Sequence, residues 1–125
     1  MALMLSLINL VFFGLEVTPR CSIGPGLILP HTHGTVIGAK CIGCNSTIFQ
    51  GVTLGAKYAD LEFDPSSRPI VGDNVTLGAG AKILGGITIG HGAIIAANSL
   101  VVSSVPDNAF MIGVPAEQKG NRHAA

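Results

Sequence analysis

An aliphatic residue recurs every six positions through the second half of the chain. In order, the series is Val71, Leu77, Ile83, Ile89, Ile95 and Val101. A helix has a period near 3.6 residues and a flat strand a period of 2, so neither explains a strict period of six. This period is typical of a parallel β-helix, in which each hexapeptide forms one short strand and one corner. We therefore expect an all-β chain whose hexapeptides close, three at a time, into triangular turns, here called coils.

The residues beside this series fit the same fold. Small or aliphatic residues stand two positions earlier, namely Val75, Ala81, Ile87, Ala93 and Ser99. A glycine or alanine directly follows most members, as Gly72, Gly78, Gly90 and Ala96 do. We expect the aliphatic series to point inward and stack from coil to coil. The glycines are expected to allow corners with positive φ.

The composition narrows the possible partners. At 125 residues the chain is long enough for one domain with a sizeable core. Charged residues make up 11% and the formal net charge is zero, so neither nucleic acid nor an anionic membrane surface is an expected partner. So few charges on an apolar chain also indicate that flat faces of the stack are buried against other subunits.

Residues 1–13 are apolar apart from Ser6 and Asn9. No basic residue precedes this run, which is shorter than the roughly 20 residues that a membrane span needs. We expect a short helix that caps the open end of the coil stack, with no membrane span. A signal peptide is the alternative interpretation.

The three cysteines are Cys21, Cys41 and Cys44. Their odd number argues against a disulfide framework and favours a reducing cytoplasm. Residues 41–44 have the CxxC pattern, which allows a zinc or redox site. Because Ile42 is in the repeat register, ordinary coil residues are the simpler interpretation, and we expect no metal.

Two segments interrupt the repeat. Residues 30–36 delay the next aliphatic to eight positions after Leu29, which predicts a projecting loop that holds two of the four histidines. Residues 55–70 lack the repeat and hold the densest group of charges, which predicts a loop extruded from the coil stack. Long loops in compact domains are often functional. The repeat domain is expected over residues 14–116, and a mobile polar tail over residues 117–125.

Histidine suits proton transfer near neutral pH, so the first loop is a candidate for catalysis. His31 follows Glu16 by fifteen residues, close to the length of one coil, so Glu16 can lie one coil away and orient the ring as a general base. His33 is the rival base, or a residue at a subunit boundary. His91 is expected to face solvent at a regular corner, and His123 lies in the tail.

Taken together, several motifs resemble the hexapeptide-repeat acyltransferases and, within them, the serine acetyltransferases. The resemblance covers about residues 10–116. Besides the loop at His31, its most specific pieces are residues 14–19 (GLEVTP), 50–55 (QGVTLG), 78–85 (GAGAKILG) and 113–116 (GVPA).

This resemblance implies a left-handed β-helix, a homotrimer with sites at subunit interfaces, and acetyl transfer from acetyl-CoA to a hydroxyl group. It matches His31 to the family's catalytic base and Glu16 to the aspartate that orients it. The coenzyme is implied to lie along the backbone that matches Gly55, Ala56, Gly80 and Ala81.

The chain departs from the family pattern at the acceptor site. Pro30 replaces the aspartate that binds serine, and Arg68 replaces a second active-site histidine. The large N-terminal helical domain has no match, which favours a single trimer over paired trimers. We expect Arg68 and His33 to contact the acceptor.

Two functions of different class remain open. The first is an acetyl-CoA-dependent O-acetyltransferase, acting on a saccharide hydroxyl as in surface polysaccharide synthesis, or on L-serine as the second choice. The second is a non-catalytic β-helix scaffold or assembly subunit.

Overall fold

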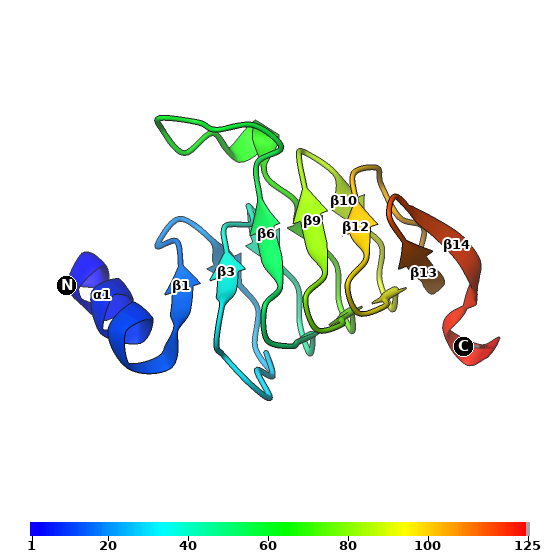
Figure 1. The fold of residues 1–125 in the computed structure, drawn as a ribbon, viewed down its shortest axis with the longest axis horizontal. Helices are drawn as coiled ribbons and strands as arrows, with labels where there is room; N and C mark the ends of the chain where they lie inside the picture. The colour runs from blue at the N-terminus through cyan, green and yellow to red at the C-terminus, as the bar shows by residue number, and fades with distance from the viewer. Residues whose placement is uncertain (125) are drawn as a thin grey trace.

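The computed structural model describes residues 1–124. Helix α1 (Ala2–Phe13) comes first, and the chain then winds into a left-handed parallel β-helix whose coils stack along one axis (Figure 1). Short strands from successive coils pair side by side and form three sheets, one for each face of the triangle. The all-β fold predicted from the six-residue period is therefore confirmed.

The strands fall into three sheets. The first contains β1 (Leu15–Val17), β3 (Thr35–Ile37), β6 (Thr53–Gly55), β9 (Lys82–Leu84) and β12 (Leu100–Val101). The second contains β2 (Ser22–Ile23), β4 (Cys41–Ile42), β7 (Ile70–Val71) and β10 (Thr88–Ile89). The third contains β5 (Thr47–Ile48), β8 (Thr76–Leu77), β11 (Ile94–Ile95), β13 (Ala109–Gly113) and β14 (Ala116–Asn121).

The core is the stacked aliphatic series. Its members from Val71 to Val101 are at most 2% exposed, and the residues two positions earlier are buried or partly buried. The register keeps equivalent positions in line, since Leu54 pairs with Ile83 and Ile83 with Val101 in the first sheet. Each fully buried Leu or Ile contributes about 1.5–3 kcal/mol, so this column supplies most of the driving force for folding.

The glycines after the aliphatic series are required for a different physical reason from the one predicted. Gly72, Gly78 and Gly90 do not have positive φ, and each lies instead against the backbone of the next coil. A Cβ atom on Gly78 would stand 2.6 Å from the backbone nitrogen of Ala97. These positions exclude a side chain because the coils approach closely, and the prediction of positive φ is wrong for them.

Positive φ is found at other corner positions. One column consists of Gly26, Asn45, Asn74, Gly92 and Asn108. Asparagine and glycine tolerate this conformation better than other residues. The N–H of Asn45 donates to Pro25, that of Asn74 to Cys44, and that of Asn108 to His91, so these corners are hydrogen-bonded from coil to coil.

The second interruption is an extruded loop, as predicted. It runs over residues 56–69, between β6 and β7, and contains one short 3₁₀ turn (Pro65–Ser67). In Figure 1 the loop rises from the stack and extends back toward the N-terminal end. At its base the N–H of Lys40 donates to the carbonyl of Pro69.

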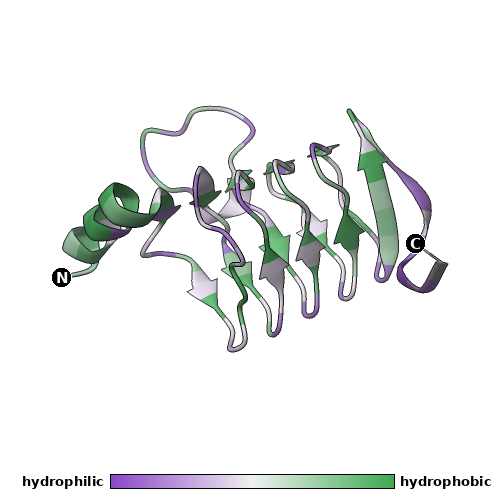
Figure 2. Cartoon of the chain, turned by 60° about the horizontal axis from the view of Figure 1, so that its bottom comes forward, coloured by the Kyte–Doolittle hydropathy of each residue, from purple (hydrophilic) through white to green (hydrophobic). Residues whose placement is uncertain are grey.

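Helix α1 lies beside β1 at the N-terminal end of the stack (Figure 2). Ser6 Oγ donates to the carbonyl of Val17 at 3.0 Å, and Gly14 ends the helix with φ 64°. None of the helix residues is buried, and Ile23 and Ile28 of the first coil also remain exposed. The helix therefore covers the end of the stack only in part. Within residues 1–124, every helix is too short or too polar to cross a bilayer.

The C-terminal tail is ordered, so the prediction of a mobile tail is wrong. Strand β14 pairs antiparallel with β13, and a 3₁₀ turn (Arg122–Ala124) follows it. The guanidinium of Arg122 donates to the carbonyls of Asn74 and Gly92 at 2.6 and 3.1 Å. These bonds hold the tail against the column of corners described above. Residue 125 lies outside the described residues.

The close approach of the coils gives a stability prediction. Gly78→Ala should lower the free energy of unfolding by about 1–3 kcal/mol, because the added methyl group meets the backbone of the next coil. Gly120→Ala is the matched control, since a Cβ atom there has nothing within 4 Å. Urea denaturation at one protein concentration measures both variants. Equal midpoints for the two would contradict the close-approach explanation.

Candidate active site

The histidine loop is fastened to the junction between α1 and β1. Thr32 Oγ1 donates to the carbonyl of Phe13 at 2.7 Å, and the N–H of Gly34 donates to the carbonyl of Gly14 at 3.0 Å. His33 lies over Gly14, where a Cβ atom would meet its ring at 3.4 Å. His31 is exposed. The two extra residues of this coil therefore project a histidine from a well-anchored loop.

Glu16 lies on the outer face of β1 and is exposed. Its position is two residues after Gly14, so the strand that carries it begins where the histidine loop is anchored. Within residues 1–124 no hydrogen bond or ion pair joins Glu16 to His31. The structure thus brings the two segments into one region but leaves the two side chains out of contact.

Arg68 is bound within its own loop. Its Nη2 donates to both carboxylate oxygens of Asp60, at 2.6 and 2.7 Å, and its guanidinium carbon lies 4.8 Å from the ring centre of Phe63. Nη1 reaches the carbonyl of Gly38 at 3.4 Å, and a Cβ atom on Gly38 would stand only 2.8 Å from that nitrogen. The predicted acceptor-binding arginine therefore fastens the extruded loop to the coil stack.

The hydrogen bonds from Arg68 hold the pKa of Asp60 below its ordinary value. Asp60 is therefore ionised at neutral pH, and a single guanidinium nitrogen, Nη2, bonds both of its oxygens. In the same loop, bonds from Ser66 lower the pKa of Asp64. The loop thus has its own polar framework.

The four predicted coenzyme residues lie in two places. Gly55 ends β6, and Ala56 lines a cavity of about 340 Å³ with the loop and with Gly85 and Gly86. Gly80 and Ala81 come just before β9, at the other end of the neighbouring strand. Ala81 is buried, and its N–H and C=O are both bonded within the stack. A coenzyme contact at Ala81 therefore stays a prediction.

The cysteines and the remaining histidines form no reactive cluster. All three cysteines are free thiols, and burial, with a smaller effect of Cys41, raises the pKa of Cys21 to about 11. Over residues 1–124 no group of three His, Cys, Asp or Glu side chains is placed to hold a metal ion. His91 is exposed, but its Nδ1 accepts the N–H of Asp73 at 2.8 Å, which makes it part of a corner.

Comparison with known proteins agrees with this architecture. Residues 68–103 match the family described as bacterial transferase hexapeptide (six repeats). The serine acetyltransferase of Staphylococcus xylosus is 42% identical over 126 residues, which cover 98% of this chain and 57% of that protein. The chain is a hexapeptide-repeat protein similar to serine acetyltransferases.

Solved structures give the same result. The serine acetyltransferase of Neisseria gonorrhoeae in complex with serine is 38% identical, with a TM-score of 0.81 over 90% of this chain and 45% of that one. A serine acetyltransferase in complex with CoA is 38% identical, with a TM-score of 0.83 over 93% of this chain and 46% of that one. The chain spans about half the length of the serine acetyltransferases that it matches.

Three residues of this region were missed by the sequence analysis. Asp60 is the partner of Arg68, Lys82 is exposed on the outer face of β9 and donates to the carbonyl of Gly51, and Arg20 lies beside the loop tip. Lys82 and Arg20 stand in regular repeats, where nothing in the period marks them. The acidic character of the loop was the only available signal for Asp60.

The hydrogen bonds between Arg68 and Asp60 should hold the extruded loop in place in a pH-dependent way. Because the pKa of Asp60 is lowered in the folded chain, its bonds stabilise the loop above the ordinary carboxyl pKa of about 4 and are lost as pH falls through the lower folded value. At pH 7, Asp60→Asn should therefore increase thermolysin cleavage within residues 56–69. Glu62→Gln is the control, because Glu62 lies in the same loop and forms no ion pair with any other of residues 1–124. Equal cleavage of both variants and the wild type would show that the pair does not anchor the loop.

Proposed function

We propose that the chain is the catalytic unit of an acetyl-CoA-dependent O-acetyltransferase with His31 as general base. The observation that carries this proposal is the anchoring of the histidine loop at Phe13 and Gly14, directly before the strand that carries Glu16. The similarity to serine acetyltransferases, one of them in complex with CoA, supports the acyl donor. The cysteines are free thiols, which supports a cytoplasmic site of action.

The chemistry needs one proton acceptor and no covalent enzyme intermediate. His31 takes the proton from the acceptor hydroxyl while the oxygen attacks the thioester carbonyl carbon. When the carbon–sulfur bond breaks, the protonated ring returns the proton to the departing thiolate. Both histidines are exposed, and His33 lies against Gly14. We assign the base to His31 on the resemblance to the acyltransferase family, and a contact with the acceptor or a subunit boundary to His33.

Glu16 has an orienting role in this proposal. A carboxylate that accepts a hydrogen bond from one ring nitrogen leaves the other nitrogen as the base. The proposed contact joins the exposed side chain of Glu16 on β1 to that of His31, whose loop is bonded to Phe13 and Gly14 at the beginning of the same strand. Catalytic hydrogen bonds are often long in unliganded proteins and shorten when substrate binds.

The donor is proposed to lie along the outer face of the first sheet. Gly55 and Gly80 stand at opposite ends of β6 and β9, about 13 Å apart along the strands, and Ala56 follows Gly55. The cavity under the loop at Ala56 is one end of this path. Exposed Lys82 lies between the two ends and offers a cation to a phosphate.

A saccharide hydroxyl is the proposed acceptor, with L-serine as the second choice. Pro30 supplies no charge at the position where an ammonium group needs a partner, and an unpaired ammonium in a closed site costs several kcal/mol. From the sequence alone, Arg68 is a candidate partner for an acceptor carboxylate. In the structure its guanidinium is already paired with Asp60. Synthesis of a surface polysaccharide is the setting that this acceptor suggests.

Release of free CoA thiol tests the proposal. Wild-type protein with acetyl-CoA should release thiol in the presence of at least one acceptor from a panel of neutral sugars, acidic sugars and L-serine. His31→Ala should lower kcat by roughly 10²–10⁴ while CoA binding is retained, because only the proton transfer is lost. His33→Ala is the comparison variant.

Three other outcomes would change the assigned base, the acceptor or the function class. A larger loss from His33→Ala than from His31→Ala would move the base to His33. Rapid turnover on millimolar L-serine alone would reject the saccharide. If the protein neither releases thiol nor binds CoA, the non-catalytic scaffold is favoured. The sequence argument for that scaffold is the change of residue at positions 30 and 68.

We also propose a homotrimer, formed by packing coil stack against coil stack. The chain has few charges, and head-to-tail contacts between two different faces of the stack close into a threefold ring. Sedimentation equilibrium at micromolar concentration should give three times the 12.7 kDa chain mass. A monomer at that concentration would reject the assembly.

A further inference from the structure

Helix α1 presents its apolar side chains to the outside and its polar side chains to the protein. Of residues 2–13, only Ser6 and Asn9 are partly buried, and Ser6 Oγ donates to the carbonyl of Val17 at 3.0 Å. All the other residues of the helix are exposed, with Leu7 at 59% and Val11 at 68%. A surface helix of a globular domain normally has the reverse arrangement, with its apolar stripe against the core. The outward face of α1 is therefore apolar and uncovered within residues 1–124.

This outward face is too wide for a single partner helix. At 3.6 residues per turn, its positions span an arc of about 220° around the helix axis. They are Leu3, Met4, Leu5, Leu7, Ile8, Leu10, Val11 and Phe12. A packed helix covers a stripe of roughly 100°, so a second copy of α1 would leave more than half of the arc in water. A fluid layer of acyl chains can cover the whole arc.

The apolar surface has no charged side chain and continues onto the coil stack. The first charged side chain of the sequence is that of Glu16, after the helix has ended. At the same end of the stack, Ile23 and Ile28 of the first coil are exposed. Figure 2 shows the helix as an apolar element at this end of the molecule. The whole N-terminal end therefore offers an apolar surface without the cost of burying a charge.

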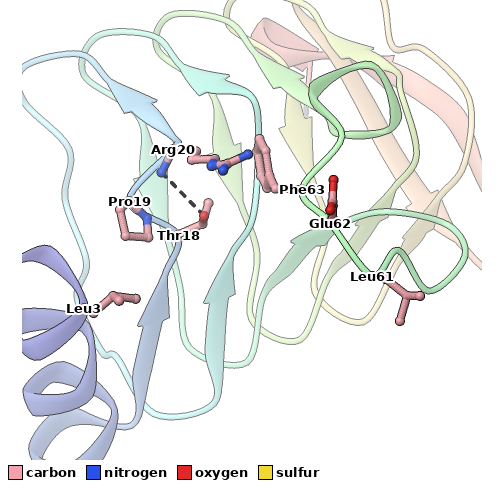
Figure 3. Close-up of a pocket in the computed structure, with 7 residues that line it drawn as sticks. All are labelled: Leu3, Thr18, Pro19, Arg20, Leu61, Glu62 and Phe63. Carbon is pink, nitrogen blue, oxygen red and sulfur yellow. Dashed lines mark hydrogen bonds between the residues drawn. The ribbon is translucent and has the colours of Figure 1, made fainter.

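The rim of this surface holds a cation. A cavity of about 540 Å³ lies between Leu3 of the helix, the corner that carries Arg20, and the tip of the extruded loop, where Leu61 is exposed (Figure 3). No carboxylate of residues 1–124 lies within 4.0 Å of the Arg20 guanidinium, although Glu62 lines the same cavity. A cation beside an apolar surface can bind a lipid phosphate while its stem stays among apolar groups.

We infer that the outward face of α1 attaches the protein to the surface of a lipid bilayer. The twelve residues of the helix are about 18 Å long, less than the roughly 30 Å of hydrocarbon in a bilayer, so the helix lies in one leaflet and does not cross. The polar side of an interfacial helix usually faces water, whereas here it faces the coil stack. Apolar contact needs no anionic lipid, which agrees with the zero net charge of the chain. The inference does not depend on the proposed transferase function.

Flotation of the full chain with phosphatidylcholine vesicles tests the inference. The wild type should float with the vesicles at low salt and in about 0.5 M salt, because salt does not screen apolar contact. Combining Leu7→Gln with Val11→Gln should lower the partition coefficient at least tenfold, because two side chains of the outward face become polar. The matched control combines Val102→Gln with Ile112→Gln, which replaces two exposed apolar residues near the C-terminal end of the stack. The control should float as the wild type does.

A tryptophan reporter shows insertion without removing an apolar residue from the helix. The chain contains no tryptophan, so Val11→Trp places a single indole on the outward face. Its emission should shift to the blue when phosphatidylcholine vesicles are added, and brominated acyl chains should quench it. Val102→Trp is the control and should show neither effect.

Four results would overturn the inference. They are wild-type protein that stays in the aqueous fraction, flotation that is lost in salt, an equal loss of flotation in the control pair, and a Val11→Trp emission that vesicles leave unchanged. A blue shift that appears with rising protein concentration in the absence of vesicles would assign the face to a second copy and would also overturn it. The thiol-release assay measures a different property, so failure of either proposal is recognisable separately.

Discussion

The distance between neighbouring coils is the constraint on which the rest of the structure depends. Paired strands lie about 4.8 Å apart, so each coil must bring its whole backbone this close to the next. Bonds such as Thr47 N–H to Val75 and Thr76 N–H to Ala93 continue from coil to coil. Side chains that point inward must then stack on residues of similar size. Where the backbone turns against the next coil, as at Gly78, there is no room for a side chain.

This constraint explains why the fold could be predicted and why one detail of it was wrong. Equivalent positions must agree in every coil, so the sequence repeats the inward residue often enough to be recognised. A period alone does not say why a glycine is present. Lack of space and positive φ both select glycine, and the asparagines at residues 45, 74, 98 and 108 are the residues that indicate corners with positive φ.

The candidate site was predictable only where it interrupts the period. The histidine loop and the extruded loop were located because they delay the next aliphatic residue. Their internal contacts were not predictable, since Asp60 meets Arg68 inside a segment without any periodicity. Arg20 occupies a regular corner and gives no signal at all. Strand β14 was missed for a similar reason, because it is polar and mostly exposed, and it is held by backbone pairing and by Arg122.

In the proposed transferase, Pro30 and Arg68 affect recognition of the acceptor more than the chemistry of transfer. A thioester is already activated, so the same histidine can take a proton from the hydroxyl of a sugar or of an amino acid. The charges around the hydroxyl are what the site must match. Pro30 has no charge, and the positive charge of Arg68 is neutralised by Asp60. In the proposed transferase, an acceptor with an ammonium group therefore lacks a partner at position 30, and an acceptor carboxylate needs a partner other than Arg68. The loop that carries Arg68 also places the ring of Phe63 beside Arg20. The Arg68–Asp60 ion pair therefore helps to position the aromatic ring that Arg20 approaches.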